Sequence, residues 1–371
     1  MKLVFFGLSI TSSWGNGHAT TYRGLCRALA AREHHIVFFE WDAPWYGGRR
    51  RDMPPSECDY ADVRLYDDWD AVRAQAARAL ADADAALLGS YVRRGPEVAD
   101  WLAQRFAGPR LFYDIDTPVT VRAYRDEGAA EYLRADQVPS FDVYLSFTGG
   151  PVLDELERHY GSPCALPLYC GVDPERHRPR SARPEFRCSL GYMGTYAPDR
   201  QPGLERLLNE PARRRPDARF VVAGPKYPRD VHWPSNVERF DHLPPADHAA
   251  FYSSNRLTLN LTRGEMRRWG WSPSVRIFEA AACGATIVSD RWKGIEAFLS
   301  PGAEILLADS SEAVLEILEL SDREVRAIGE AARERVLAEH TNRVRAGQLV
   351  AAVERALSTG ATAAGRPTAG G

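Results

Sequence analysis

The sequence has no long hydrophobic run, no paired cysteines and no excess charge of either sign. A membrane helix needs about 20 apolar residues, and every apolar stretch of this sequence is much shorter. The first residues lead into an expected strand and do not have the pattern of a secretion signal. The six cysteines lack the spacing of a zinc site or a disulfide framework. A net charge of -3 argues against a global basic surface for nucleic acid. We therefore expect a cytoplasmic protein with no clear nucleic-acid or membrane signal.

Apolar runs of strand length alternate with helical stretches along both halves of the chain. The first half opens with an expected strand over 3–10, then a loop, a helix over 19–32 and a strand over 35–40. This βαβ order is typical of α/β proteins with doubly wound parallel sheets. The 371 residues suit two such domains of roughly 150 to 190 residues. A proline-rich stretch over 163–184 lies between them.

These patterns set the expected domain limits. We place an N-terminal Rossmann-like domain at 1–172 and a C-terminal Rossmann-like domain at 173–345. A helix over 346–357 is expected to pack back on the first domain. Residues 358–371 are expected to be a disordered tail, because glycine, alanine, threonine and proline give them too little apolar bulk to fold. Ligands in doubly wound sheets bind beyond the carboxyl ends of the strands, so functional residues are expected in the loops after strands.

The most informative segment is a short helix followed directly by a strand. Ser272 is a natural N-cap, and Pro273 suits the first helical turn, where its missing N–H has no intrahelical partner to lose. Gly284 accepts the left-handed conformation that ends helices. The apolar run at 285–289 then predicts a buried strand.

The start of this helix carries residues suited to a nucleotide. A helix N-terminus attracts phosphate through its free N–H groups, here around Ser274. Arg276 and Glu279 lie three residues apart and share one face of the helix. Glu279 is placed to accept hydrogen bonds from vicinal ribose hydroxyls. The pattern indicates a nucleoside diphosphate site, and the alternative is a simple surface ion pair between Arg276 and Glu279.

The same segment resembles the donor-binding helix of two-domain GT-B glycosyltransferases. The resemblance is strongest to the group that includes spore maturation protein CgeB, through Phe-Glu-Ala at 278–280, two small residues and Cys283-Gly284 before a strand. It extends to retaining glycosyltransferase family 4, where Glu279 matches the second of two glutamates and Trp271 stands in place of the first. It implies a GT-B fold, with two Rossmann-like doubly wound domains facing a central cleft and a nucleotide-sugar-binding second domain. It also implies a nucleoside diphosphate sugar as co-substrate, with no metal and no other cofactor.

The resemblance extends to the loop that ends the first strand of the second half. In family 4 this loop has a glycine followed by an arginine, then a lysine, and both basic residues contact the diphosphate. Here Gly194 matches, Thr195 replaces the arginine and Arg200 takes the lysine position, so the lost charge is expected to come from Arg263 or Arg276. The resemblance implies these donor-binding residues: Gly194, Thr195, Arg200, Arg263, Ser274, Arg276, Glu279, Lys293 and Gly294.

Two strand ends in the first half supply the catalytic candidates. Gly15 and Gly17 let a ligand approach the backbone beside a helix N-terminus, and their loop resembles the glycine-rich turn on the acceptor side of GT-B enzymes. His18 is a candidate sugar contact or base, with a helix cap as the alternative. Asp116 follows the strand at 110–114 and is the second candidate. Its alternatives are an N-cap or turn role, or a divalent metal held by paired aspartates.

We therefore expect a metal-independent glycosyltransferase (EC 2.4) that moves a sugar from a nucleoside diphosphate sugar to an unidentified acceptor. The resemblance to family 4 favours retention, in which the leaving phosphate takes the acceptor proton. Inversion would instead use His18 or Asp116 as general base. Two alternatives stay open: a nucleotide-sugar epimerase of the same architecture, and a non-catalytic nucleotide- or glycan-binding protein.

Overall fold

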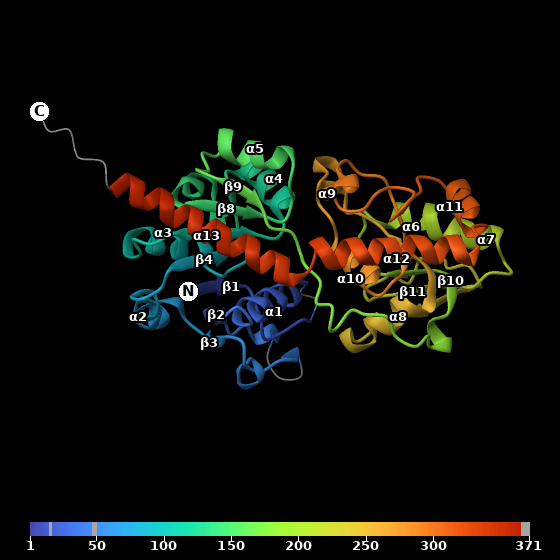
Figure 1. Ribbon diagram of the computed structural model, residues 1–371, viewed down its shortest axis with the longest axis horizontal. Coiled ribbons are helices and arrows are strands. Elements are labelled where there is room, and N and C mark those ends of the chain that lie inside the picture. The colour runs from blue at the N-terminus through green and yellow to red at the C-terminus, as the bar shows by residue number, and fades with distance from the viewer. Residues whose placement is uncertain (15–16, 47–49, 365–371) are drawn as a thin grey trace, which may run out of the picture. The chain divides into compact units, whose positions relative to one another are not determined.

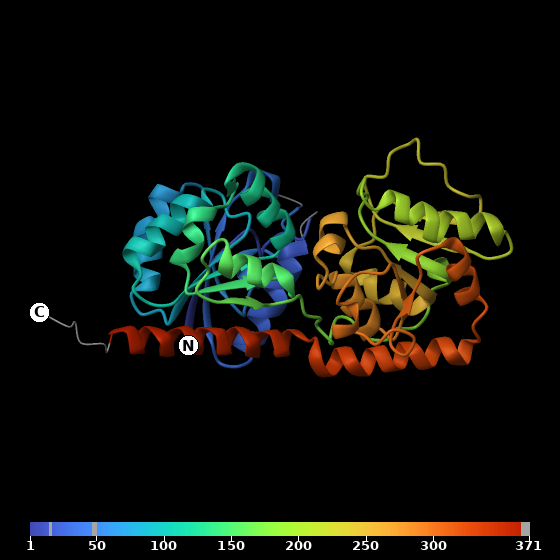
Figure 2. The same ribbon diagram turned by 90° about the horizontal axis from the view of Figure 1, so that it is seen from above.

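The computed structural model describes residues 1–14, 17–46 and 50–364, so the expected ligand-loop residue Gly15 lies outside the described residues. The chain divides into two compact units. One is formed by Met1–Gly171 together with Asn342–Gly371, and the other by Val172–Thr341. Each unit has a parallel sheet flanked by helices (Figure 1, Figure 2). No helix in the described part of the chain is both long and apolar enough to cross a lipid bilayer.

The described part of the first unit contains a parallel sheet in the order β3-β2-β1-β4-β5-β8-β9. The strands are β1 Lys2–Gly7, β2 His35–Trp41, β3 Asp62–Tyr66, β4 Ala85–Gly89, β5 Arg110–Asp114, β8 Val143–Ser146 and β9 Ala165–Pro167, and a separate antiparallel pair is β6 Ala129–Ala130 with β7 Leu133–Arg134. Because β1 lies between β2 and β4, the winding reverses at β1 and β4. The loops after these two strands are therefore where a ligand is expected.

Helices cover both faces of this sheet. They are α1 Gly17–Ala30, α2 Trp69–Leu80, α3 Gly95–Arg105, α4 Thr117–Glu127, α5 Pro151–Arg158 and α13 Asn342–Ala364. Side chains of β1 alternate between the faces: Phe5 packs in one core with residues of α1 and α13, and Phe6 packs against Trp69 and Trp101 of α2 and α3 on the other. Burial on both faces is why β1 and its neighbours read as continuous apolar runs.

The second unit repeats this design. Its sheet has the order β12-β11-β10-β13-β14-β15, with all the pairs parallel. The strands are β10 Cys188–Met193, β11 Phe220–Ala223, β12 Val237–Phe240, β13 Asn255–Asn260, β14 Thr286–Ser289 and β15 Leu306–Leu307, and the helices are α6 Gln201–Leu204, α7 Glu210–Arg214, α8 His248–Ser254, α9 Gly264–Trp269, α10 Val275–Ala282, α11 Ser311–Leu318 and α12 Asp322–Glu339. The winding reverses between β10 and β13, which brings the loops after these strands to one edge of the sheet.

Three expected elements differ from the structure. β1 ends at Gly7 rather than at residue 10, because the backbone N–H groups of Ile10 and Thr11 bond the buried side-chain carboxylate of Glu40 instead of the backbone of a neighbouring strand. The N-cap of α10 is Ser274, so the expected start at Ser272 and Pro273 is wrong by two residues. α13 begins before the expected 346 and continues to Ala364, although a disordered tail was expected from 358. Alanine is the strongest helix former, which explains why the alanine-containing segment after 357 continues α13 although it has few large apolar residues.

Candidate functional site

The side chain of Arg276 crosses the reversal point of the second sheet. Its Nε donates to the carbonyl oxygen of Met193 at 2.7 Å, at the end of β10, and its Nη1 donates to Oδ1 of Asn260 at 2.9 Å, at the end of β13. The same amide oxygen accepts a hydrogen bond from the Ser274 hydroxyl at 2.8 Å. Arg276 is buried, with 8% of its surface exposed. The side chain is therefore held in place at the edge where a ligand is expected, rather than extended into solvent.

Gly194 is the residue that lets this guanidinium approach the loop after β10. A Cβ at this position would lie 2.9 Å from Nη2 of Arg276 and 2.6 Å from the Tyr192 hydroxyl. The carbonyl oxygen of Gly194 also lies against Gly224, and a Cβ on Gly224 would lie 2.1 Å from this oxygen. Only glycine fits at this crossing, so the expected importance of Gly194 has a packing reason. The glycine is a neighbour of the arginine as well as a candidate ligand contact.

Arg200 lies beside Arg276 and adds a second positive charge. Burial, together with the nearby Arg276 charge, lowers the pKa of the Arg200 guanidinium. Its Nη2 donates to the carbonyl of Thr195 at 2.7 Å, while its Nε is buried without a hydrogen-bond partner among the described residues. Neither arginine has an ion pair with a carboxylate in the described part of the chain. Two desolvated cations without an ion-pair partner among the described residues make this edge suited to an anion, although the Asp199 carboxylate acts on Arg200 from nearby.

The structure places the other expected donor residues at the rim of the same edge. Arg263 is exposed at the N-cap of α9, outside the contacts of Arg200 and Arg276. Lys293 is exposed, with its Nζ 5.2 Å from the centre of the Trp271 ring. Gly294 is buried with φ +86°, and a Cβ there would lie 2.5 Å from that ring. Arg276 therefore lies beside the loop that carries Gly194 and Thr195, whereas Arg263 is exposed; which of them replaces the charge missing at Thr195 stays a prediction.

Glu279 lies one turn after Arg276 in α10 and is also buried, with 7% of its surface exposed. Its Oε2 accepts a hydrogen bond from the Tyr252 hydroxyl at 3.4 Å, and its Oε1 lies 3.5 Å from Nε2 of His177. Arg276 and Glu279 make different contacts, so the alternative of a surface ion pair between them is wrong. Long contacts leave this buried carboxylate with unused capacity to accept hydrogen bonds, which buried carboxylates rarely retain.

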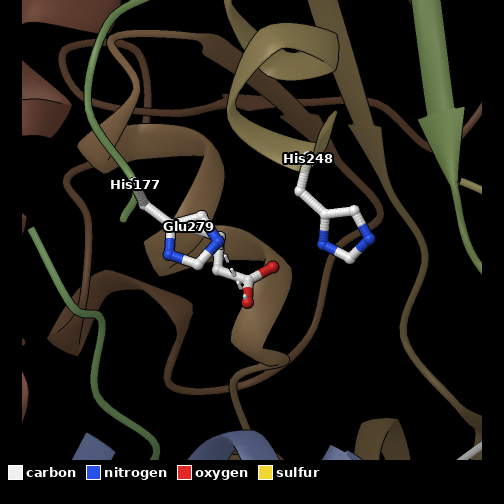
Figure 3. Close-up of side chains that lie close together, drawn as sticks. All are labelled: His177, His248 and Glu279. Carbon is white, nitrogen blue, oxygen red and sulfur yellow. Dashed lines mark ion pairs between the residues drawn. The ribbon is translucent and has the colours of Figure 1, made fainter. Parts of the chain in front are cut away.

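Two histidines beside Glu279 were not expected as site residues. His177 follows the crossing between the units, and His248 begins α8. Figure 3 shows both imidazole rings next to the Glu279 carboxylate. One ligand atom from each residue lies within 4.8 Å of the other two. No sequence signal connects these residues, because His177 lies in the proline-rich stretch at 163–184 and His248 is the first residue of a helix of only seven residues.

Asp290 was also missed as a site residue. It follows β14, and its Oδ1 accepts hydrogen bonds from the backbone N–H and the hydroxyl of Thr262, both at 3.0 Å. Burial raises the pKa of Asp290 to about 6. It lines a pocket together with Arg200, Arg206 and Arg267. Asp199 lines the same pocket, and protonation of Asp290 at slightly acidic pH removes one of the two negative charges there.

The two catalytic candidates of the first unit lie close together. Asp116 follows β5, and its Oδ2 accepts a hydrogen bond from the Tyr91 hydroxyl at 2.9 Å. The Tyr91 ring meets the His18 imidazole edge-on, with ring centres 5.2 Å apart. Burial lowers the pKa of His18, while the charge of Asp116 acts in the opposite direction. Asp116 occupies the N-cap position of α4, yet its side chain makes no capping hydrogen bond. The N-cap alternative for Asp116 is therefore confirmed for its position in the backbone, while its side chain is directed to Tyr91 instead of to the helix N–H groups.

Buried carboxyl groups support the loops of this first site. Asp114 accepts a hydrogen bond from the Tyr144 hydroxyl at 2.6 Å and one from the Asp116 backbone N–H at 3.1 Å, and burial raises its pKa to about 6. Glu40, at the end of β2, accepts hydrogen bonds from the backbone N–H groups of Ile10 and Thr11. Both groups are therefore committed to the scaffold. A Cβ on Gly17 would meet no atom within 4 Å, so packing does not require glycine there.

Comparison with known proteins identifies the architecture. Residues 200–351 match a family model described as "Glycosyl transferase-like". A search of curated proteins found no match. Similar solved structures include sucrose-phosphate synthase from Thermosynechococcus elongatus, with 15% identity and a TM-score of 0.70 over 97% of this chain and 100% of that one. Anabaena HepE in complex with UDP and glucose has 11% identity and a TM-score of 0.68 over 96% and 100%.

A third similar structure is an alpha-glucosyltransferase in complex with UDP-glucose and DNA containing an abasic site. It has 12% identity and a TM-score of 0.68 over 95% of this chain and 99% of that one. These findings confirm the expected GT-B fold and the expected likeness to glycosyltransferases, whereas the CgeB-like subgroup stays a prediction. The chain therefore has the GT-B fold, and its residues 200–351 match the family model described as "Glycosyl transferase-like".

Proposed function

We propose that this protein transfers a sugar from a nucleoside diphosphate sugar to an acceptor, with retention and without a metal ion. The observation that carries the proposal is the pair of desolvated arginines, Arg200 and Arg276, at the reversal point of the second sheet. A diphosphate would bring negative charge into contact with both guanidinium groups, neither of which has an ion-pair partner among the described residues. When the sugar departs, the diphosphate gains negative charge, and fixed guanidinium groups stabilise that charge without reorganisation.

The nucleoside half of the donor fits the same helix. Glu279 is one turn away from Arg276, and its long contacts leave lone pairs for two ribose hydroxyls. Two of the similar structures, HepE and the alpha-glucosyltransferase, were solved with UDP or UDP-glucose, which makes uridine the first base to test. Rim residues Lys293 and Gly294 then lie on the side expected for the sugar. Cytoplasmic location and a CgeB-like subgroup remain predictions within this proposal.

Isothermal titration calorimetry with UDP, UMP and uridine tests the donor site. We expect UDP to bind more tightly than UMP, and UMP more tightly than uridine, because each phosphate adds contacts to the arginines. Glu279→Gln should weaken the binding of UDP and uridine by similar factors, since both carry the ribose. Glu238→Gln, on β12, is the matched control and should change neither. Equal affinity for all three ligands would refute the diphosphate site.

Product analysis separates the three functional classes. Incubation with UDP-glucose and a panel of sugar acceptors should release UDP in proportion to glycoside formed, and NMR of the product should show the donor's anomeric configuration retained. An epimerase would instead convert the nucleotide sugar with no acceptor present. A binding protein would bind UDP in calorimetry and release no product under any acceptor condition.

A further inference from the structure

We propose that His177, His248 and Glu279 form a binding site for a divalent transition metal of the zinc class, and that the bound metal excludes the donor nucleoside. The three side chains come from the crossing segment, from α8 and from α10, and they converge in the second unit (Figure 3). Binding of the metal rests on their geometry alone. Its effect on the donor rests on the proposed function of Glu279.

The hydrogen bonding of His248 prepares one nitrogen as a ligand. Its Nε2 lies 3.2 Å from the carbonyl oxygen of Leu243, and a carbonyl can only accept, so Nε2 carries the proton. Nδ1 is then the unprotonated nitrogen, and it lies on the side of the ring that faces Glu279 (Figure 3). A backbone carbonyl bonded to the far nitrogen is the usual support of a metal-binding histidine.

His177 and Glu279 already have the spacing of two ligands of one metal ion. Zinc–ligand bonds are about 2.0–2.2 Å long, so two ligand atoms of a tetrahedral site lie about 3.3 Å apart. Nε2 of His177 and Oε1 of Glu279 are separated by 3.5 Å. Nδ1 of His177 is buried and has no hydrogen-bond partner among the described residues, whereas Nε2 faces the Glu279 carboxylate, which attracts the ring's proton. Metal binding at Nε2 must therefore release this proton or move it to Nδ1, because the ligand is an unprotonated imidazole nitrogen.

The donor set decides the class of metal. Two imidazole nitrogens and one carboxylate oxygen suit zinc, cobalt and nickel, whereas magnesium and calcium prefer oxygen ligands alone. All three ligand atoms lie within 4.8 Å of one another, so closing the site needs a side-chain shift of at most about 1.5 Å. Three protein ligands leave a fourth position for water. Glu279 cannot bind the metal and two ribose hydroxyls with the same oxygens, and this makes the two ligands competitors.

Cobalt is the direct probe, because tetrahedral Co²⁺ absorbs strongly in the visible region. The full chain, stripped with a chelator, should bind one Co²⁺ with a visible band, and Zn²⁺ should displace it. His177→Ala and His248→Ala should each weaken binding by at least tenfold. His159→Ala is the control, since His159 is exposed in the first unit and pairs with Glu155. If an alanine variant unfolds, His248→Leu replaces the ring with an apolar group suited to α8.

The competing outcomes are distinct. Unchanged Co²⁺ affinity in folded His177 and His248 variants, or weak binding of several ions, would overturn the metal site. UDP titrations at saturating Zn²⁺ should show at least tenfold weaker UDP binding in the wild type and little effect in His248→Ala. Equal weakening in both proteins would overturn the competition. Failure of UDP to bind even without metal, with Co²⁺ binding intact, would refute the proposed donor site and leave the metal site standing.

Discussion

The side chain of Asn260 holds Arg276 at the edge of the second sheet, with its Oδ1 accepting from Nη1 at 2.9 Å. Its Nδ2 donates to the Ser289 hydroxyl at 2.9 Å, which fixes which end of the amide faces the arginine. The amide is neutral. Arg276 is therefore positioned by hydrogen bonds that leave its positive charge uncompensated, and the charge stays available to a ligand.

Asn260→Asp should give Arg276 a carboxylate partner of nearly the same shape. We expect UDP affinity to fall by at least tenfold, about 1.4 kcal/mol, because the new charge competes with the phosphates. The stability of the second unit should change little, since the buried acid is paired. Asn236→Asp is the control, because Asn236 donates to three backbone carbonyls and an aspartate side chain cannot donate to them. This substitution should lower the stability of the second unit and leave the UDP affinity of the folded protein unchanged. Calorimetry and urea unfolding measure both effects.

Arg200→Gln should separate stability from binding. The Arg200 guanidinium is desolvated and has no ion-pair partner among the described residues, so its removal should leave urea stability unchanged or raise it, while UDP affinity falls by at least tenfold. Arg256→Gln should show the reverse pattern, because Arg256 pairs with Asp322 at 2.8 Å. A loss of stability without a loss of affinity in Arg200→Gln would contradict an anion-binding role.

Asp290 should make the second unit less stable as the pH rises. Its folded pKa of about 6 is above the unfolded value of about 3.9, so the folded state holds the proton more tightly. This contribution is full below about pH 4 and is lost as the pH rises through about 6, with a size of about 1–3 kcal/mol. Urea unfolding from pH 4 to 8 should show that the free energy of unfolding decreases less with pH in Asp290→Asn than in the wild type. Asp114→Asn should flatten the profile in the same direction for the first unit, since its pKa is also about 6.

His18→Gln tests the stereochemical proposal. Retention uses the leaving phosphate as the proton acceptor, so we expect the turnover number to fall by less than about tenfold and its pH profile to keep its shape. A general base contributes about 10²–10⁴-fold. A loss of that size, together with the disappearance of one limb of the pH profile, would assign the base to His18 and indicate inversion. Tyr91→Phe, which removes the hydroxyl bonded to Asp116, should have a smaller effect.

Much of the architecture could be predicted from local pattern. The buried strand expected at 285–289 and the two parallel strands of the βαβ unit that opens the chain are confirmed. They could be predicted because a strand that is buried on both faces of a parallel sheet appears in the sequence as an apolar run. Gly194, Arg200 and Arg276 could be assigned to one edge because parallel strands place their carboxyl ends together. The N-cap of α10 could not be placed from the sequence, since the Ser274 hydroxyl donates to Asn260 of β13 and makes no capping bond to its own helix.

The sequence by itself determined the two α/β units and the basic character of the ligand edge, because periodicity and strand ends act over a few residues. Only the tertiary structure decided which arginines lose contact with water and that His177 and His248 lie beside Glu279. It also decided that the Glu40 carboxylate binds the backbone of the first loop. Burial and convergence depend on packing between segments far apart in the chain. No local pattern of residues records that packing.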